Sequence, residues 1–358
     1  MNENVSQRRR AARGQAMSPR WTAAVAILAL LAAAACGSGE GADHTQPATS
    51  TGGEAAAFPR TIRHAFGETV IPQEPRRVVA WGWGSADAAI AVGVVPVAIP
   101  FQAYGGDAEG VLPWIRERLR ADGAQLPKVL PDAKEPPFEA IAAARPDLIL
   151  AVYSGITGDD YKLLSGIAPT VAYPDKPWAT PWRDTVKIVG SALGRDQQAA
   201  EVLRGIDEEV AAKASAHPEL KGKSVAMVWD SAGTFYVYKP ADARVEFTLA
   251  LGLVSAPSVT ALASGESSFF YTLSYEQLEK LTSDILVSYA DTPEASNAFL
   301  SSPHGQLMEQ VRTGRVAPVI GKEFIASVSP PTALSLTWGL DEYVRILATA
   351  AKAAGGPR

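Results

Sequence analysis

The stretch Phe138-Glu-Ala-Ile-Ala-Ala-Ala-Arg-Pro-Asp-Leu-Ile-Leu-Ala-Val-Tyr153 contains the unit from which the fold is predicted. Its first part has the composition of a short helix, and Pro146-Asp147 interrupts that pattern. Residues 148–152 are a continuous apolar run, which is typical of a strand buried on both faces. The stretch therefore predicts a helix, a turn and a parallel strand, with the aromatic Tyr153 directly after the strand.

The same alternation recurs on both sides of one long helical segment. Stretches with a helical pattern separate short apolar runs, which lie at residues 78–80, 148–152, 170–172, 225–228, 285–287 and 316–320. Buried strands that alternate with helices predict an α/β protein with two lobes, each built on a parallel-rich sheet.

The segment between the two sets of strands is expected to be one long helix. Apolar residues repeat there at helical spacing, and Asp196 is a plausible N-cap. About 20 residues at 1.5 Å each give a rod of roughly 30 Å, long enough to connect two lobes. We therefore expect an N-terminal lobe at 58–195, an interlobe helix at 196–217 and a C-terminal lobe at 218–358. A final helix after Pro330-Pro331 should bury Leu336, Leu340, Tyr343 and Leu347.

The first 57 residues have the pattern of an export and anchoring segment. Five arginines precede an uncharged apolar run at residues 21–35, which is too short for a membrane span but fits a signal-peptide core. Ala33-Ala34-Ala35 then leads into Cys36 and resembles a bacterial lipobox, although that pattern prefers Leu where Ala33 stands. We predict a signal peptide at 1–35, lipidation of Cys36 and a flexible polar tether at 36–57. An ordinary cleaved signal with an incidental cysteine is the alternative.

Composition excludes several classes of protein and site. Apolar residues make up 47% of the 358 residues, which provides for a packed core. A pI near 5.5 argues against a general nucleic-acid binder. Cys36 is the only cysteine, so intramolecular disulfides and multi-cysteine metal sites are excluded. Four scattered histidines and the lack of a G-x-S-x-G, Walker or H-E-x-x-H motif predict neither an enzyme nor a directly bound metal.

Aromatic residues follow the predicted strands repeatedly. Ligands of open parallel sheets bind beyond the carboxyl ends of the strands, so these rings could line a cleft for a bulky, partly apolar ligand. For each ring the alternative is packing in the core or between lobes, and for Arg244 it is a solvated surface charge. The candidate ligand-binding residues are Trp81, Trp83, Tyr104, Tyr153, Tyr173, Trp178, Trp229, Tyr236, Arg244, Phe270, Tyr289 and Trp338.

Several further stretches resemble one family, the substrate-binding lipoproteins of ABC importers for iron–siderophore complexes, which are related to the cobalamin and haem binders. The resemblance covers about residues 60–350. It rests on His64-Ala-Phe-Gly67, Pro75-Arg76-Arg77-Val78-Val79, Ala91-Val92-Gly93-Val94-Val95-Pro96-Val97, the 138–149 stretch, Leu164-Ser165-Gly-Ile167-Ala168-Pro169 and Leu273-Ser274-Tyr275-Glu276-Gln277-Leu278.

The resemblance implies a periplasmic-binding-protein-like fold with a helical backbone and a shallow cleft between the lobes. It also implies that one glutamate on each lobe docks onto the permease, and the matching positions are Glu139 and Glu276. Iron would arrive already coordinated by the siderophore, so the protein would bind no cofactor directly. The expected protein is a monomeric lipoprotein on the outer face of the cell membrane.

The identity of the ligand stays open at this stage. A cleft rich in aromatic rings and poor in arginine suits a neutral or weakly charged hydroxamate-type chelate better than a strongly anionic one. The alternatives are cobalamin or haem in the same fold, or an envelope lipoprotein with an enzymatic or a structural role.

Overall fold

The computed structural model describes residues 58–265 and 267–355, which contain two larger sheets and one hairpin. The elements before α6 are called the N lobe below, and those after it the C lobe. The N-lobe sheet has the order β5-β4-β3-β6-β7, with every neighbouring pair parallel. Its strands are β3 (Val78–Ala80), β4 (Ala98–Ile99), β5 (Lys128–Val129), β6 (Leu148–Ala151) and β7 (Thr170–Ala172). Its helices are α1 (Ser85–Ala91), α2 (Pro113–Ala121), α3 (Phe138–Ala143), α4 (Gly158–Ser165) and α5 (Trp182–Ala192).

The C-lobe sheet is mixed. Strands β8, β10, β12 and β13 run parallel, whereas β9 lies antiparallel between β8 and β11. The prediction of two lobes with parallel-rich sheets is therefore confirmed. The strands are β8 (Ser224–Ser231), β9 (Thr234–Tyr238), β10 (Val254–Ser255), β11 (Phe270–Leu273), β12 (Ile285–Ala290) and β13 (Val316–Ile320). The helices are α7 (Ala243–Ala250), α8 (Pro257–Ala261), α9 (Pro293–Ser301), α10 (Glu309–Arg312) and α11 (Lys322–Val328), with 3-10 turns η1 (Pro218–Leu220), η2 (Tyr275–Lys280) and η3 (Gly305–Leu307).

The hairpin formed by β8 and β9 was not predicted from the sequence. Ala232 and Gly233 both have positive φ, which is the geometry of a two-residue hairpin turn. Tyr236 and Phe270 lie on β9 and β11, two strands that the sequence pattern did not predict. The sequence prediction also ended two strands too early: Trp229 lies inside β8 and Tyr289 inside β12.

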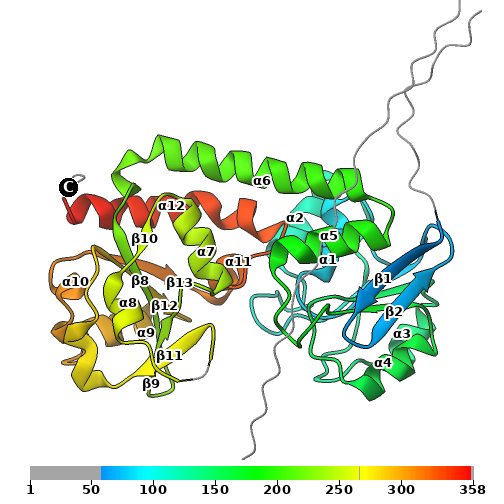
Figure 1. Cartoon of the computed structure of the whole chain (residues 1–358), viewed down its shortest axis with the longest axis horizontal. Coiled ribbons are helices and arrows are strands. Elements are labelled where there is room, and N and C mark those ends of the chain that lie inside the picture. The colour runs from blue at the N-terminus through cyan, green and yellow to red at the C-terminus, as the bar shows by residue number, and fades with distance from the viewer. Residues whose placement is uncertain (1–57, 266, 356–358) are drawn as a thin grey trace, which may run out of the picture. The chain divides into compact units, whose positions relative to one another are not determined.

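Two long helices accompany the lobes. Helix α6 (Asp196–Ala216) is the predicted interlobe helix, and α12 (Ser335–Ala353) packs against it (Figure 1). Lys213 of α6 forms an ion pair with Asp341 of α12. The predicted N-cap of α6 is wrong: Arg195 caps the helix, and the Asp196 carboxylate instead lies 2.7 Å from Nη1 of Arg60.

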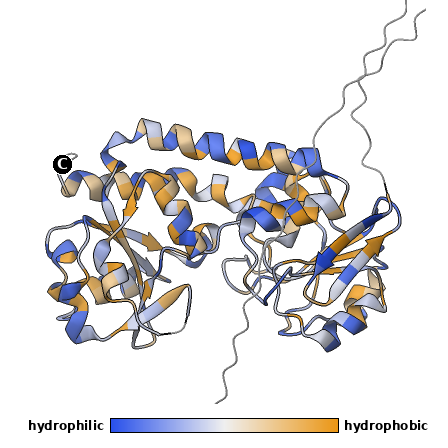
Figure 2. Ribbon diagram, in the orientation of Figure 1, coloured by the Kyte–Doolittle hydropathy of each residue, from blue (hydrophilic) through white to orange (hydrophobic). Residues whose placement is uncertain are grey.

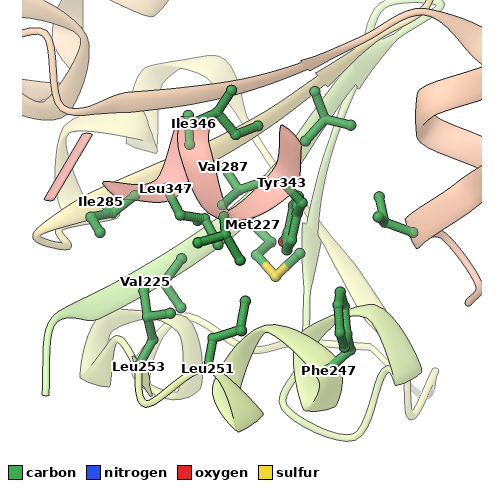
Figure 3. Packing of buried hydrophobic residues seen from close by; sticks show 14 of the residues in the cluster. Val225, Met227, Phe247, Leu251, Leu253, Ile285, Val287, Tyr343, Ile346 and Leu347 are labelled. Atoms are coloured by element: carbon green, nitrogen blue, oxygen red, sulfur yellow. The ribbon is translucent and has the colours of Figure 1, made fainter. Parts of the chain in front are cut away.

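The core of the C lobe lies between its sheet and helices α7 and α12. Figure 3 shows Val225 and Val287 of the sheet facing Leu251, at the C-cap of α7, and Leu347 of α12. The four apolar residues predicted for the final helix are all buried there. Each fully buried side chain of this size contributes about 1.5–3 kcal/mol. In Figure 2 the strands are mainly hydrophobic, whereas α6 alternates between polar and apolar residues. No helix among the described residues has the length and hydropathy of a membrane span.

A hairpin of β1 (Arg60–His64) and β2 (Gly67–Ile71) is joined to β7 by the hydroxyl of Thr69, which His64 contacts. The Phe66 backbone N–H donates to Nδ1 of His64 at 3.2 Å, so the proton of the neutral ring resides on Nε2. Nε2 donates to the Thr69 hydroxyl at 2.9 Å, and that hydroxyl donates to the carbonyl oxygen of Thr170 at 2.6 Å. Protonation of Nδ1 would set two N–H donors against each other.

Burial lowers the pKa of His64 below its usual value of 6.5. The unfolded chain therefore binds a proton more readily, so this site stabilises the fold above about pH 6.5 and the contribution is lost as the pH falls. We expect His64→Gln to destabilise the protein at pH 7.5, and the difference from wild type to shrink as the pH is lowered to 5.5. Urea unfolding at both pH values measures this, with exposed His304→Gln as the control. A difference that does not change with pH contradicts the assignment.

Candidate ligand cleft

The carboxyl ends of β3 and β6 lie close together. Trp83 donates its backbone N–H to the Tyr153 carbonyl oxygen at 2.9 Å. Gly82 has φ +84°, and a Cβ there would lie 2.3 Å from that carbonyl oxygen. Only glycine permits this approach, which brings Trp81 and Trp83 next to the loop after β6.

A hollow of about 500 Å³ opens at this edge of the N-lobe sheet. Its walls are aromatic and polar, and they come from the loops after β3, β4, β5, β6 and β7 and from the first turn of α4. The side chains that matter for recognition are Trp81, Trp83, Phe101, Gln102, Lys134, Glu135, Asp160 and Trp178.

A second hollow of about 300 Å³ lies between the lobes. The N lobe contributes Tyr153 and Trp178, and the C lobe contributes residues around the start of α7 and the start of β11. The C-lobe lining includes Tyr238, Asp242, Arg244, Glu246, Phe269 and Phe270. The two hollows share Trp178, so together they form one cleft with this indole between them.

Trp178 is held in an unusual conformation. Its side chain is 54% exposed, and its φ of +55° is rare for a residue other than glycine. The indole lies edge-on to the Tyr153 ring at 5.7 Å and occupies the space where a Cβ on Gly155 would stand, 2.2 Å from Nε1. Backbone strain that supports an exposed tryptophan is typical of a ligand-contacting position.

Arg244 is already paired within the cleft. Its Nε lies 2.7 Å from Oδ1 of Asp242, and its guanidinium lies 3.9 Å from the centre of the Tyr238 ring. Burial raises the pKa of Asp242, and the positive charge of Arg244 opposes that effect. The pair leaves little net charge for a ligand at this wall.

The charges that line the two hollows are predominantly negative. Lys134 and Arg244 are the cations, against the four carboxylates of Glu135, Asp160, Asp242 and Glu246. A strongly anionic ligand would meet net repulsion in this cleft.

The structure brings half of the predicted ligand-binding residues together. Trp81, Trp83, Tyr153, Trp178, Arg244 and Phe270 line the two hollows. Tyr236 is 5.5 Å from the Phe270 ring, and Trp229 is 6.0 Å from the Tyr289 ring. Ligand contact by any of these residues stays a prediction.

The remaining candidates make contacts within the protein. The Tyr173 hydroxyl is buried and donates to the Ile156 carbonyl oxygen at 3.0 Å, and Tyr289 is 2% exposed. Tyr104 donates to Asp291 at 2.7 Å, and Trp338 donates to Glu117 at 3.0 Å. The sequence analysis did not select several residues that line the cleft, among them Phe101, Gln102 and Tyr238. Phe101 and Gln102 follow β4 and Tyr238 ends β9, and neither strand was predicted.

Glu139 and Glu276 are exposed on different lobes. Each lies in the first turn of a short helical element, α3 and η2 respectively. Neither carboxylate forms an ion pair or a hydrogen bond with any other residue that the structure describes. Arg77 fixes the end of α3 by donating to the carbonyl oxygens of Ala144 at 2.5 Å and Arg145 at 2.9 Å.

Metal-ligand chemistry is sparse in the described part of the chain. Within residues 58–265 and 267–355, no three His, Cys, Asp or Glu side chains lie together in a way that could hold a metal ion. Cys36, the predicted lipidation site, lies outside the described residues.

Comparison with known proteins identifies the family. The model of the periplasmic binding protein family matches residues 78–319. The chain belongs to this family. The family consists of substrate-binding transport proteins that act outside the cytoplasm, and it is not a family of enzymes.

Several relatives within the family are named for the iron complexes that they bind. The chain is 27% identical to the probable siderophore-binding lipoprotein YfiY of Bacillus subtilis and 31% identical to the Fe(3+) dicitrate-binding periplasmic protein FecB of Escherichia coli. The matches cover 60% and 48% of this chain, and 61% and 53% of the lengths of those two relatives. The crystal structure of PiaA from Streptococcus pneumoniae in complex with ferrichrome is 35% identical, with a TM-score of 0.73 over 82% of this chain and 99% of that one. The predicted resemblance to iron–siderophore binders is confirmed.

Removal of the Arg244 charge should destabilise the fold, because Asp242 is its buried ion-pair partner. Arg244→Met leaves the buried Asp242 carboxylate without a counter-charge, so we expect a loss of about 3 kcal/mol in unfolding free energy. The double variant Asp242→Asn/Arg244→Met should recover most of that loss, because the neutral amide needs no counter-charge. Urea unfolding of wild type, both single variants and the double variant measures the coupling. Additive losses would contradict a coupled pair.

Proposed function

We propose that this protein captures a ferric siderophore in the cleft between its lobes and delivers it to an ABC importer. The observation that carries the proposal is the pair of hollows on either side of Trp178, which have aromatic walls from both lobes and volumes of about 500 and 300 Å³. The kinship with proteins named for siderophore binding supports the same conclusion. Iron enters as cargo that the siderophore already coordinates, so the protein supplies hydrogen bonds and ring contacts and catalyses no reaction.

The charge balance of the cleft favours a neutral or weakly charged ferric complex. Four carboxylates face two cations, and Asp242 already neutralises Arg244. Hydroxamate chelates of Fe(III) carry little or no net charge at neutral pH, whereas catecholate and citrate complexes are anionic. We therefore propose a hydroxamate-type siderophore as the ligand.

A fluorescence titration tests this choice of ligand. Trp81, Trp83 and Trp178 lie at the cleft itself, so the tryptophan fluorescence reports binding there. We expect saturable quenching by a ferric trihydroxamate and weaker or no saturable quenching by ferric catecholate or citrate complexes, after correction for ligand absorbance. Saturation by haem or cobalamin alone would contradict the siderophore proposal while leaving the cleft as the binding site.

Trp178 should contribute strongly to affinity. Trp178→Ala removes a half-exposed ring that borders both hollows, so we expect the ferric trihydroxamate to bind at least about tenfold more weakly by calorimetry. The matched control is Leu163→Ala, which removes an exposed apolar side chain on α4 that lines neither hollow. If wild type and Trp178→Ala bind the complex with equal affinity, the indole does not contribute to the binding site.

Delivery requires contact with a membrane permease. We propose that the unpaired Glu139 and Glu276 dock onto cationic residues of that permease, one on each lobe, and that a lipid on Cys36 keeps the monomeric protein near it. Paired charges of this kind orient the encounter and increase its rate.

The docking proposal predicts a defect in transport without a defect in binding. Glu139→Lys/Glu276→Lys should leave the affinity for the ferric complex unchanged and reduce uptake of radioactive iron by cells at least about tenfold, because two attractions become repulsions. Glu279→Lys, an exposed residue of the same turn η2, is the control. Normal uptake by the double variant would contradict docking through these two residues.

A further inference from the structure

Several side-chain hydrogen bonds connect the N lobe to the C lobe. In the part of the chain that the structure describes, their N-lobe partners all lie within residues 83–117. Trp83 Nε1 donates to the Pro330 carbonyl oxygen at 3.1 Å, and Tyr104 donates to Asp291 at 2.7 Å. The Thr332 hydroxyl donates to Asp87 at 2.5 Å. One side of the interlobe contact is thus fastened by polar bonds, whereas the hollow beside Trp178 remains open.

Asp87 is the most deeply buried of these groups. It lies in the first turn of α1 and is 1% exposed. Its Oδ1 accepts two short hydrogen bonds, from the Trp114 indole of its own lobe and from the Thr332 hydroxyl of the other, both at 2.5 Å. Burial raises the pKa of Asp87, and the bonds from Thr332 and Trp114 oppose that effect. A carboxylate here costs desolvation energy that a neutral acceptor would largely avoid.

Thr332 connects Asp87 to the start of α12. Its hydroxyl accepts from the Ser335 backbone N–H at 3.1 Å, and its own backbone N–H donates to the Ser335 hydroxyl at 2.8 Å. The Ser335 hydroxyl in turn donates to the Ser327 carbonyl oxygen in α11 at 2.6 Å. The reciprocal bonds between Thr332 and Ser335 have the form of a capping box. Through Thr332, the carboxylate of the N lobe therefore holds the junction of two C-lobe helices.

The same short segments line the cleft. Trp83, four residues before Asp87, borders the N-lobe hollow, and Pro330, two residues before Thr332, borders the interlobe hollow. A shift between these segments would move both walls. The relative position of the walls decides whether one ligand can contact both lobes at once, and ordering them before binding reduces the cost of binding.

We propose that Asp87 is a positioning residue: its bond to Thr332 holds the two lobes in the arrangement that binds the ferric complex. The inference rests on the proposed function and deepens it, since it assigns the control of affinity to a buried interlobe bond outside the ligand cleft. Loss of the bond spreads the lobes over several arrangements, of which only a fraction binds. The apparent dissociation constant rises by the inverse of that fraction.

Thr332→Val tests the proposal because it removes the hydroxyl with almost no change of shape. If about a tenth of the molecules keep the competent arrangement, the ferric trihydroxamate binds about tenfold more weakly. Thr332→Ser keeps the hydroxyl and should restore wild-type affinity. The matched control is Thr170→Val, which removes a buried hydroxyl that donates to the Ala168 carbonyl oxygen within the N lobe, and it should leave affinity within about twofold of wild type even where it lowers stability.

A distance measurement separates positioning from stability and from failure of the siderophore proposal. In the full chain with Cys36→Ser, spin labels at Leu163→Cys on α4 and Gln277→Cys on η2 report the spacing of the lobes without any ligand. Thr332→Val should broaden the distribution, and Thr332→Ser should not. An unchanged distribution, or a Thr332→Val variant that is less stable but binds as wild type, would overturn the proposal. Broadening in a protein that binds no siderophore would support the positioning role and reject the proposed ligand.

Discussion

The segment that leads into α12 joins the two lobes of this protein through the most deeply buried of the hydrogen bonds between them. On the C-lobe side, α12 packs onto the sheet through four buried side chains, so the helix cannot move without disturbing that core. These side chains are Leu336, Leu340, Tyr343 and Leu347. Three residues before α12 begins, the Thr332 hydroxyl donates a hydrogen bond to the buried carboxylate of Asp87 in the N lobe. The helix is therefore part of the C-lobe core, and its start is also bonded to the N lobe. This bond fixes the relative position of the two cleft walls.

Within the cleft, glycine and charge pairing determine what a ligand meets. Gly82 and Gly155 allow a backbone carbonyl and an indole to approach where a Cβ would not fit, which sets Trp83 and Trp178 at the opening. Arg244, the arginine in the lining, is neutralised by Asp242. The resulting surface offers ring faces and hydrogen-bond donors with little positive charge, and this differs from what a highly anionic iron complex requires.

The sequence predicted the two-lobed α/β fold and the long helix because buried parallel strands and amphipathic helices have strong periodic patterns. It predicted Trp81, Trp83 and Tyr153 of the cleft lining because ligands collect at the carboxyl ends of strands. It missed β9 and β11, whose antiparallel pairing depends on the two-residue turn at Ala232 and Gly233. It could not separate Tyr173 and Tyr289 from true cleft residues, since an aromatic after an apolar run packs inward or outward according to tertiary contacts. Asp87 gave no signal, because its role depends on a partner 245 residues away.

The most direct test of a ferric ligand in this cleft is the position of the iron in crystals grown with a ferric trihydroxamate. Anomalous diffraction at the iron absorption edge locates the metal without reference to the protein. Our account predicts one strong peak between the lobes, in the space bounded by Trp83, Trp178 and Arg244. A peak elsewhere on the surface, or none at saturating ligand, would contradict it.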